Sequence, residues 1–112
     1  MEVRIASYCA YRLQYNVVWV CKCRRRILNP GVQICLKTLL NGLLRSMPGV
    51  EVDLIGFDAD HLHMVMIIPP KYGISEVMGR LKIQSASAMR KKFEWLSKVY
   101  WKKDVVWSRV IS

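Results

Sequence analysis

Apolar residues recur at three- and four-residue intervals through one segment of this chain and at two-residue intervals on either side of it. The three- and four-residue spacing predicts an amphipathic helix that begins at Asn29-Pro30 and that Pro48-Gly49 ends. The apolar stripe of this helix consists of Val32, Cys35, Leu36, Leu39, Leu40, Leu43, Leu44 and Met47.

The two-residue spacing predicts strands at Arg12–Val20, Val50–Phe57 and His61–Ile68, the last two joined as a hairpin through Asp58-Ala59-Asp60. We expect a second helix from Ile74 to Leu96, with Ser75 as its cap, and a last strand over 104–112. The order strand, helix, strand, strand, helix, strand is that of the split βαβ arrangement. The predicted fold is therefore α+β: a ferredoxin-like sandwich in which two helices cover one face of a four-stranded antiparallel sheet, in a single domain over 1–112.

Charge limits the classes of partner. The chain has 112 residues and a formal net charge of +10 at pH 7, from 18 Lys and Arg against 8 Asp and Glu. The electrostatic field of such a positive charge attracts polyanions, of which nucleic acid and anionic membranes are the usual ones. The longest apolar stretch, His61–Pro70, is much shorter than the roughly 20 residues that cross a bilayer. We expect a cytoplasmic protein whose four cysteines, Cys9, Cys21, Cys23 and Cys35, are reduced. A zinc site on these cysteines remains the less favoured alternative, because their spacing matches no common zinc module.

Two histidines stand one residue apart at the start of the third predicted strand. Side chains at i and i+2 of a strand share a face and lie about 6 to 7 Å apart, so His61 and His63 could bind one metal ion. Because Leu62, Met64, Met66 and Ile68 would face the helices, the histidines would face the open side of the sheet. Alternatively, His61 finishes the turn at Asp58 and His63 is a surface residue. The short motif alone favours this second interpretation.

The sequence around the histidines resembles the small single-tyrosine HUH transposases of bacterial and archaeal insertion sequences, the TnpA-type, IS200-like family. The resemblance covers nearly the whole chain in order and spacing. It is carried by YNVVWVCKCRRR at 15–26, GFDADHLH at 56–63, IPPKY at 68–72, YWK at 100–102 and VWSR at 106–109.

The resemblance implies a homodimeric DNA transposition enzyme that acts on single-stranded, hairpin-containing DNA. In this family the two histidines, here His61 and His63, bind Mg²⁺ or Mn²⁺, and a tyrosine attacks the scissile phosphate to form a 5′-phosphotyrosine. With only these two family ligands present, Asp58 and Asp60 are possible substitute ligands, since carboxylates suit Mg²⁺.

The family continues after the Trp-Ser-Arg stretch with the helix that bears the nucleophilic tyrosine, whereas this sequence ends at Ser112. We therefore expect that helix to be missing and strand cleavage to be impaired, through a truncated gene, a shortened sample or domestication as a binding protein. None of the five tyrosines stands at the nucleophile position, and Tyr100 is expected to pack in the core.

The excess of positive charge predicts phosphate binding by a set of mainly basic residues. The candidate DNA-binding residues are Lys22, Arg24, Arg25, Arg26, Lys71, Arg80, Lys82, Ser85, Arg90, Lys91 and Arg109. The leading hypothesis competes with a noncatalytic single-stranded nucleic-acid-binding module. A histidine-dependent phosphohydrolase ranks last, because the sequence holds no third histidine.

Overall fold

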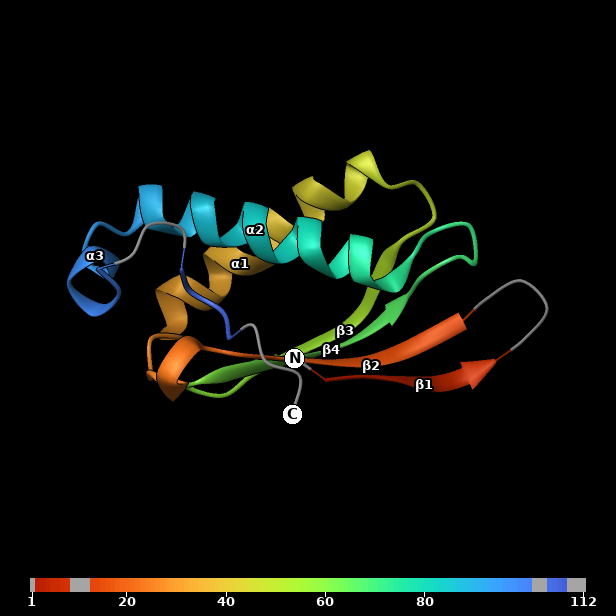
Figure 1. Cartoon of the computed structure of the whole chain (residues 1–112), viewed down its shortest axis with the longest axis horizontal. Coiled ribbons are helices and arrows are strands. Elements are labelled where there is room, and N and C mark those ends of the chain that lie inside the picture. Colours follow the sequence, from red (N-terminus) through yellow and green to blue (C-terminus); the bar gives the residue numbers. More distant parts are fainter. Residues whose placement is uncertain (1, 9–12, 102–104, 109–112) are drawn as a thin grey trace.

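The computed structural model describes residues 2–8, 13–101 and 105–108. Its centre is an antiparallel sheet of four strands in the order β1-β2-β4-β3, with β1 at Glu2–Tyr8, β2 at Leu13–Val20, β3 at Glu51–Phe57 and β4 at His61–Ile67. Two long helices, α1 at Pro30–Leu43 and α2 at Ile74–Lys92, lie side by side on one face of this sheet (Figure 1). The predicted α+β sandwich is confirmed.

The order of elements differs from the prediction at both ends of the chain. The sheet takes its outer strand from β1, an N-terminal segment that was not predicted as a strand. The predicted strand at 104–112 is reduced, in its described part, to one bridge between Cys21 and Trp107. The two segments share one edge of β2: β1 pairs with Leu13–Val18, whereas the amide of Ser108 donates to the carbonyl of Val20.

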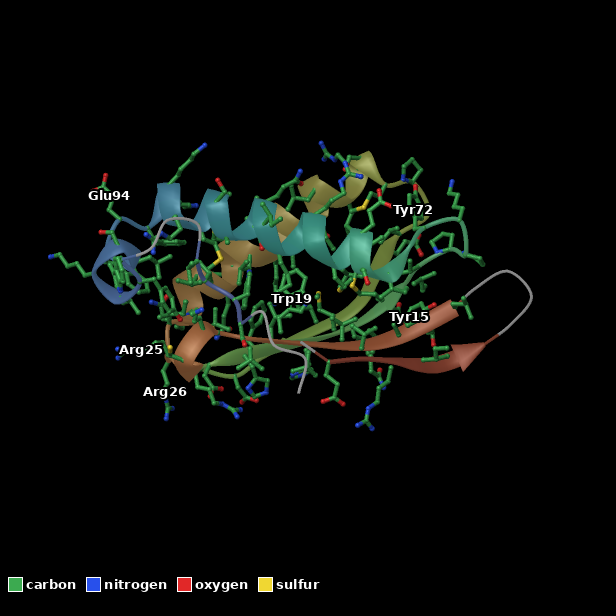
Figure 2. The ribbon with its side chains drawn as sticks, viewed as in Figure 1. Tyr15, Trp19, Arg25, Arg26, Tyr72 and Glu94 are labelled. Carbon is green, nitrogen blue, oxygen red and sulfur yellow. The ribbon has the colours of Figure 1, made fainter. Side chains whose placement is uncertain are left out.

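The core lies between the sheet and the two helices. Tyr15, Val17 and Trp19 of β2 alternate toward the helices, and Trp19 is seen between the layers in Figure 2. From β4, Leu62 and Met64 point the same way. Burying each such side chain contributes on the order of 1.5–3 kcal/mol, so the face of β4 that carries these residues is fixed and the opposite face is left open.

Helix boundaries follow local chemistry. The Asn29 side chain accepts a hydrogen bond of 3.0 Å from the amide of Val32, as expected of an N-cap before Pro30. The helix α1 ends at Leu43 and tightens into the 3₁₀ turn η2, Leu44–Ser46. The second helix is shorter than predicted: Gly73 rather than Ser75 caps it, and it breaks after Lys92 before the short helix α3, Leu96–Val99.

A second 3₁₀ turn, η1 at Lys22–Arg24, follows β2 directly. Two successive residues in it have left-handed backbone, Cys23 with φ of 57° and Arg24 with φ of 51°. Residues other than glycine seldom adopt this conformation, which costs of the order of 1–2 kcal/mol per residue. The turn sends the chain sharply away from β2 and places the side chains of residues 22–26 at the same end of the sheet as the β3–β4 turn.

Candidate metal centre and nucleic-acid interface

The tight turn between β3 and β4 brings three candidate ligands together. The amide of Asp58 donates a 2.8 Å hydrogen bond to the carbonyl of His61, which closes the turn. One ligand atom each from Asp58, His61 and His63 lies within 4.8 Å of the others. We call these three residues the metal cluster. Among the residues that the structure describes, they are the one group of His, Cys, Asp or Glu side chains with such spacing.

Both ring nitrogens of His61 face carboxylates. Nδ1 lies 2.8 Å from Oδ1 of Asp60, and Nε2 lies 3.0 Å from Oδ2 of Asp58. A neutral imidazole carries a proton on only one nitrogen. If Nδ1 donates to Asp60, then Nε2 and the Asp58 carboxylate are two acceptors facing each other, and a positive charge is needed beside them. Either a second ring proton or a metal ion supplies it.

The donor set fits a divalent cation. Adjacent ligands around an octahedral ion with bonds near 2.1 Å lie about 3 Å apart, which matches the Nε2 to Oδ2 separation in the pair of His61 and Asp58. The carboxylate of Asp58 suits Mg²⁺ or Mn²⁺, whereas the two imidazoles also suit Zn²⁺ or Fe²⁺, so the donor set alone does not select one divalent metal.

His63 stands on the open face of the sheet beside His61. The two ring centroids are 6.3 Å apart, in the range predicted from strand spacing. Its register partner on β3 is Gly56, and the His63 ring occupies the space that a side chain there would need: an added β-carbon would lie 2.8 Å from Cε1 and closer still to Nε2. Gly56 therefore makes room for the imidazole.

Asp60 does not belong to the metal cluster. Its carboxylate bonds Nδ1 of His61 and accepts a 3.4 Å hydrogen bond from Nε of Arg24. The hydrogen bond with His61, followed by the contacts with Arg24, holds the pKa of Asp60 below its usual value. Of the two proposed substitute ligands, Asp58 thus faces the histidines, whereas Asp60 orients His61 from outside, the usual arrangement around a metal-binding histidine.

The predicted DNA-binding residues fall into three groups. Those of the basic segment 22–26 are exposed beside the metal cluster, and Figure 2 shows Arg25 and Arg26 projecting from this end of the molecule. A second group, Lys71, Arg80 and Lys91, is exposed elsewhere. Arg109 lies outside the described residues.

The third group makes internal contacts. Ser85 is fully buried, donates to the carbonyl of Lys82 and accepts a 3.0 Å hydrogen bond from the indole of Trp107, so the predicted phosphate contact of Ser85 is wrong. The ammonium of Lys82 donates to the carbonyl of Ser108 at 2.6 Å, and burial lowers its pKa. Arg90 donates to the carbonyls of Leu96 and Tyr100. These three side chains hold the C-terminal segment rather than face solvent freely.

The described tyrosine side chains that make hydroxyl hydrogen bonds donate them to backbone carbonyls. Tyr100 is buried, as expected, and its hydroxyl donates to the carbonyl of Lys22, while burial raises its pKa. Tyr72 donates to the carbonyl of Pro48, at the end of the molecule opposite Arg25 (Figure 2). Tyr15 is a core residue.

The described cysteines form no common site. Cys21 is buried, Cys23 is exposed and Cys35 is half-buried on α1, and among the described residues no metal-binding group includes them. Cys9 lies outside the described residues.

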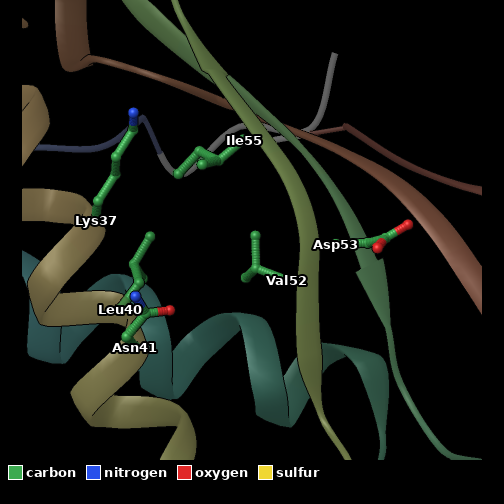
Figure 3. A pocket seen from close by; sticks show the side chains of 6 residues that line it. All are labelled: Lys37, Leu40, Asn41, Val52, Asp53 and Ile55. Carbon is green, nitrogen blue, oxygen red and sulfur yellow. The ribbon is translucent and has the colours of Figure 1, made fainter.

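Hollows in the surface help to locate a ligand. The one between α1 and β3 has a volume of about 210 Å³, and Figure 3 shows Lys37 and Asp53 on opposite sides of the β3 ribbon, so its charged groups do not converge. A larger hollow of about 410 Å³ lies on the open face of the sheet, where His63 borders Val18, Leu54 and Val65. Of these two hollows, the one on the open face of the sheet is bordered by a candidate metal ligand, His63. No helix among the described residues is long and apolar enough to span a bilayer.

Comparison with known proteins gives consistent matches. The profile of a family described as "Transposase IS200 like" matches residues 9–110. The chain is 27% identical over 101 residues to the ISDra2 transposase TnpA of Deinococcus radiodurans, covering 90% of this chain and 71% of that protein. It is 26% identical over 100 residues to transposases for insertion sequence element IS200 of Salmonella typhimurium and Salmonella typhi, covering 85% of this chain and 65% of each.

A solved structure described as that of a transposase from Deinococcus radiodurans R1 has the same fold. The TM-score is 0.80 at 24% sequence identity, over 96% of this chain and 81% of that one.

Proposed function

The chain belongs to the IS200-like transposase family, and on that premise we propose that its metal cluster holds Mg²⁺ or Mn²⁺ against a phosphate of single-stranded DNA. The observation that carries this proposal is the approach of Nε2 of His61 to Oδ2 of Asp58 at 3.0 Å, with His63 beside them. DNA transposition is the family's function, and single-stranded hairpin DNA is the substrate that the resemblance implies.

Each residue of the metal cluster has a distinct part in this proposal. Asp58, His61 and His63 would hold the ion, and Asp60 would fix the tautomer and orientation of His61 through Nδ1. The bound ion would supply Lewis-acid polarisation of the scissile phosphate. Arg24, held beside Asp60 at 3.4 Å, would add a positive charge close to the same phosphate.

Cleavage also needs a nucleophile at the phosphate. The hydroxyls of Tyr72 and Tyr100 donate to backbone carbonyls, and Tyr15 is in the core. We propose that the described residues bind and position single-stranded DNA, and that none of these three tyrosines is the nucleophile that attacks the phosphate.

The charge of the chain supports backbone binding. Neutralising several phosphates releases counterions, so affinity for a single strand should fall steeply as salt rises. An affinity for single-stranded DNA that does not change with salt concentration would contradict the proposed phosphate contacts.

Assembly as a homodimer is part of the same proposal, because the family works as dimers on hairpin ends. Light scattering should give about twice the 13.0 kDa mass of one chain. A clean monomer at high concentration would contradict it.

The second candidate, a noncatalytic nucleic-acid-binding module, rests on the same basic surface and differs in its use of metal. Hairpin DNA binding should be measured with and without Mn²⁺ for the wild-type chain and for His61→Ala, with Lys37→Ala as a control for the loss of an exposed side chain on another face. The transposase proposal expects Mn²⁺ to tighten binding in the wild type and not in His61→Ala. Indifference of both proteins to Mn²⁺ would favour the module.

A further inference from the structure

A hollow of about 330 Å³ lies between η1 and the end of α3 with the segment that follows it. It is lined by Lys22, Cys23 and Arg25 on one side and by Val99, Tyr100 and Trp101 on the other. This volume is at the small end of ligand pockets, and the lining combines aromatic surface with two cations.

Trp101 is the unusual member of this hollow. Its side chain is 93% exposed, whereas Trp19 and Trp107 are buried in the core and Trp95 is 38% exposed. A single exposed apolar side chain needs no explanation by itself. Here, however, the indole stands at the rim of a hollow beside Lys22 and Arg25, and an aromatic face next to cations is how proteins bind unpaired bases of single strands.

Hydrogen bonds hold together the two segments that line the hollow. Tyr100 is buried and its hydroxyl donates to the carbonyl of Lys22 at 2.8 Å, which joins the two sides. Arg90 donates to the carbonyls of Leu96 and Tyr100, and so fixes the backbone directly before Trp101. The backbone that carries the Trp101 indole is thus held in place by hydrogen bonds.

The left-handed turn at Cys23 and Arg24 connects this hollow to the metal cluster. Arg24 reaches Asp60 beside the metal cluster, while its neighbours Cys23 and Arg25 line the hollow. A strand whose phosphate lies at the metal cluster would meet Arg24 first and the hollow next. The turn that contains the two left-handed residues thus places Arg24 at Asp60, and Cys23 and Arg25 at the hollow.

We propose that this hollow, the base pocket, receives one unpaired base of the bound DNA strand, stacked on Trp101, with its flanking phosphates held by Lys22 and Arg25. The inference rests on the proposed function and deepens it, because it names a contact that distinguishes single-stranded from duplex DNA.

The test measures binding of a dye-labelled oligothymidylate in EDTA, where the metal cluster plays no part. Trp101→Ala should weaken binding about tenfold, the effect of losing one base–aromatic stack, and Trp101→Phe should recover most of it. Duplex DNA of the same length should bind Trp101→Ala and wild type alike. Trp95→Ala is the matched control, since it removes the other partly exposed indole without touching the base pocket.

Charge and stacking are separable in the same assay. Arg25→Ala should lower the dependence of affinity on salt, because a phosphate contact is lost, whereas Trp101→Ala should leave that dependence unchanged. Equal effects of Trp101→Ala and Trp95→Ala, or equal loss on duplex and single strand, would overturn the base pocket.

A second measurement needs no variant. Bound oligothymidylate should slow alkylation of Cys23, which lines the base pocket, while alkylation of Cys35 on α1 proceeds as before. Unchanged alkylation of Cys23 at saturating DNA would contradict the proposal. None of these measurements uses metal. Failure of Mn²⁺ binding would therefore contradict the metal cluster and not the base pocket, and failure of the oligothymidylate tests would contradict the base pocket and not the metal cluster.

Discussion

The imidazole of His63 on β4 lies over the α-carbon of Gly56 on β3, and there is room for it only because position 56 has no side chain. An added β-carbon would meet Nε2, Cε1 and Cδ2 of the ring, the last two at 2.8 and 3.0 Å. The three atoms belong to the end of a flexible side chain, so an obstruction would move the ring rather than the strand.

Substituting Gly56 by alanine should therefore weaken metal binding and spare the fold. The displaced His63 ring would leave Asp58 and His61 without their third partner, and we expect Mn²⁺ affinity to fall by about tenfold or more, as for other changes that disturb a ligand's orientation. Calorimetric titration gives the affinity, and urea denaturation should give a stability close to that of the wild type.

Gly79 provides the matched control. An added β-carbon there meets nothing within 4 Å, and the residue lies inside α2. Alanine at 79 should raise stability by about 0.5–1 kcal/mol and leave Mn²⁺ affinity unchanged. Equal metal affinity in Gly56→Ala and Gly79→Ala would refute the positioning of His63 by Gly56.

Asp60 should matter for metal affinity although it lies outside the group of Asp58, His61 and His63. Replacing it by asparagine keeps the size of the side chain and removes the charge that orients His61 through Nδ1 and attracts Arg24. We expect Mn²⁺ affinity to fall by about 10- to 100-fold, the range for partners of metal-binding histidines. Asp53→Asn, on β3 and away from the metal cluster, should have no effect, and a loss as large as that of Asp60→Asn would point to general charge instead.

Ser85 should contribute to stability and not to DNA binding. Its hydroxyl accepts from the indole of Trp107 at 3.0 Å in a buried position. Ser85→Ala leaves that N–H without a partner, and the free energy of unfolding should drop by about 1–3 kcal/mol. Ser87→Ala in the same helix is the control in urea denaturation. Weaker DNA binding by Ser85→Ala at unchanged stability would restore its predicted phosphate contact.

Burial of Cys21 should make the protein less stable at alkaline pH. Burial, aided by the negative charge of Asp60, raises the pKa of the Cys21 thiol from 9.0 to about 12. Because the folded state holds this proton more tightly than the unfolded chain, its contribution is complete below pH 9.0 and is lost as pH rises toward 12. The slope is up to about 1.4 kcal/mol per pH unit.

Cys21→Ala removes this group and with it the alkaline loss that Cys21 causes. Urea denaturation of both proteins below pH 9.0 and at a pH between 9.0 and 12 should show the wild type losing more stability than the variant. A constant difference between the two proteins across that range would contradict the prediction.

The sheet and its helices could be predicted wherever one face of an element is buried. Apolar residues alternate in β2 and recur every three or four positions in α1 because those residues face the core, and both patterns are visible in the sequence. The outer strand β1 shows this alternation only over its first residues: Val3 packs against the core, but Ile5 is 63% exposed, and the strand is held to β2 mainly by backbone hydrogen bonds. The predicted strand at 104–112 had strand-like residues, but in its described part Val106 and Trp107 are buried because they cover the end of the core beside Cys21.

In the candidate metal cluster, only the placement of the two histidines could be predicted, because it follows from the geometry of a strand. The two-residue spacing places His61 and His63 on one face, but the separate positions of Asp58 and Asp60 depend on the turn, which spacing does not specify. Likewise, a basic residue in the sequence does not reveal whether it binds phosphate or a backbone carbonyl, as Arg90 does. Trp101 gave no signal of its own, since only the structure separates an exposed indole from the buried ones.

The most direct test is a calorimetric titration of Mn²⁺ into the wild-type chain and into a variant with both His61→Ala and His63→Ala, with circular dichroism to establish that both are folded. The metal cluster predicts one site per chain in the wild type and none in the variant. Equal Mn²⁺ binding by two folded proteins would contradict the assignment of these histidines, and with it the proposed role of this site in DNA transposition.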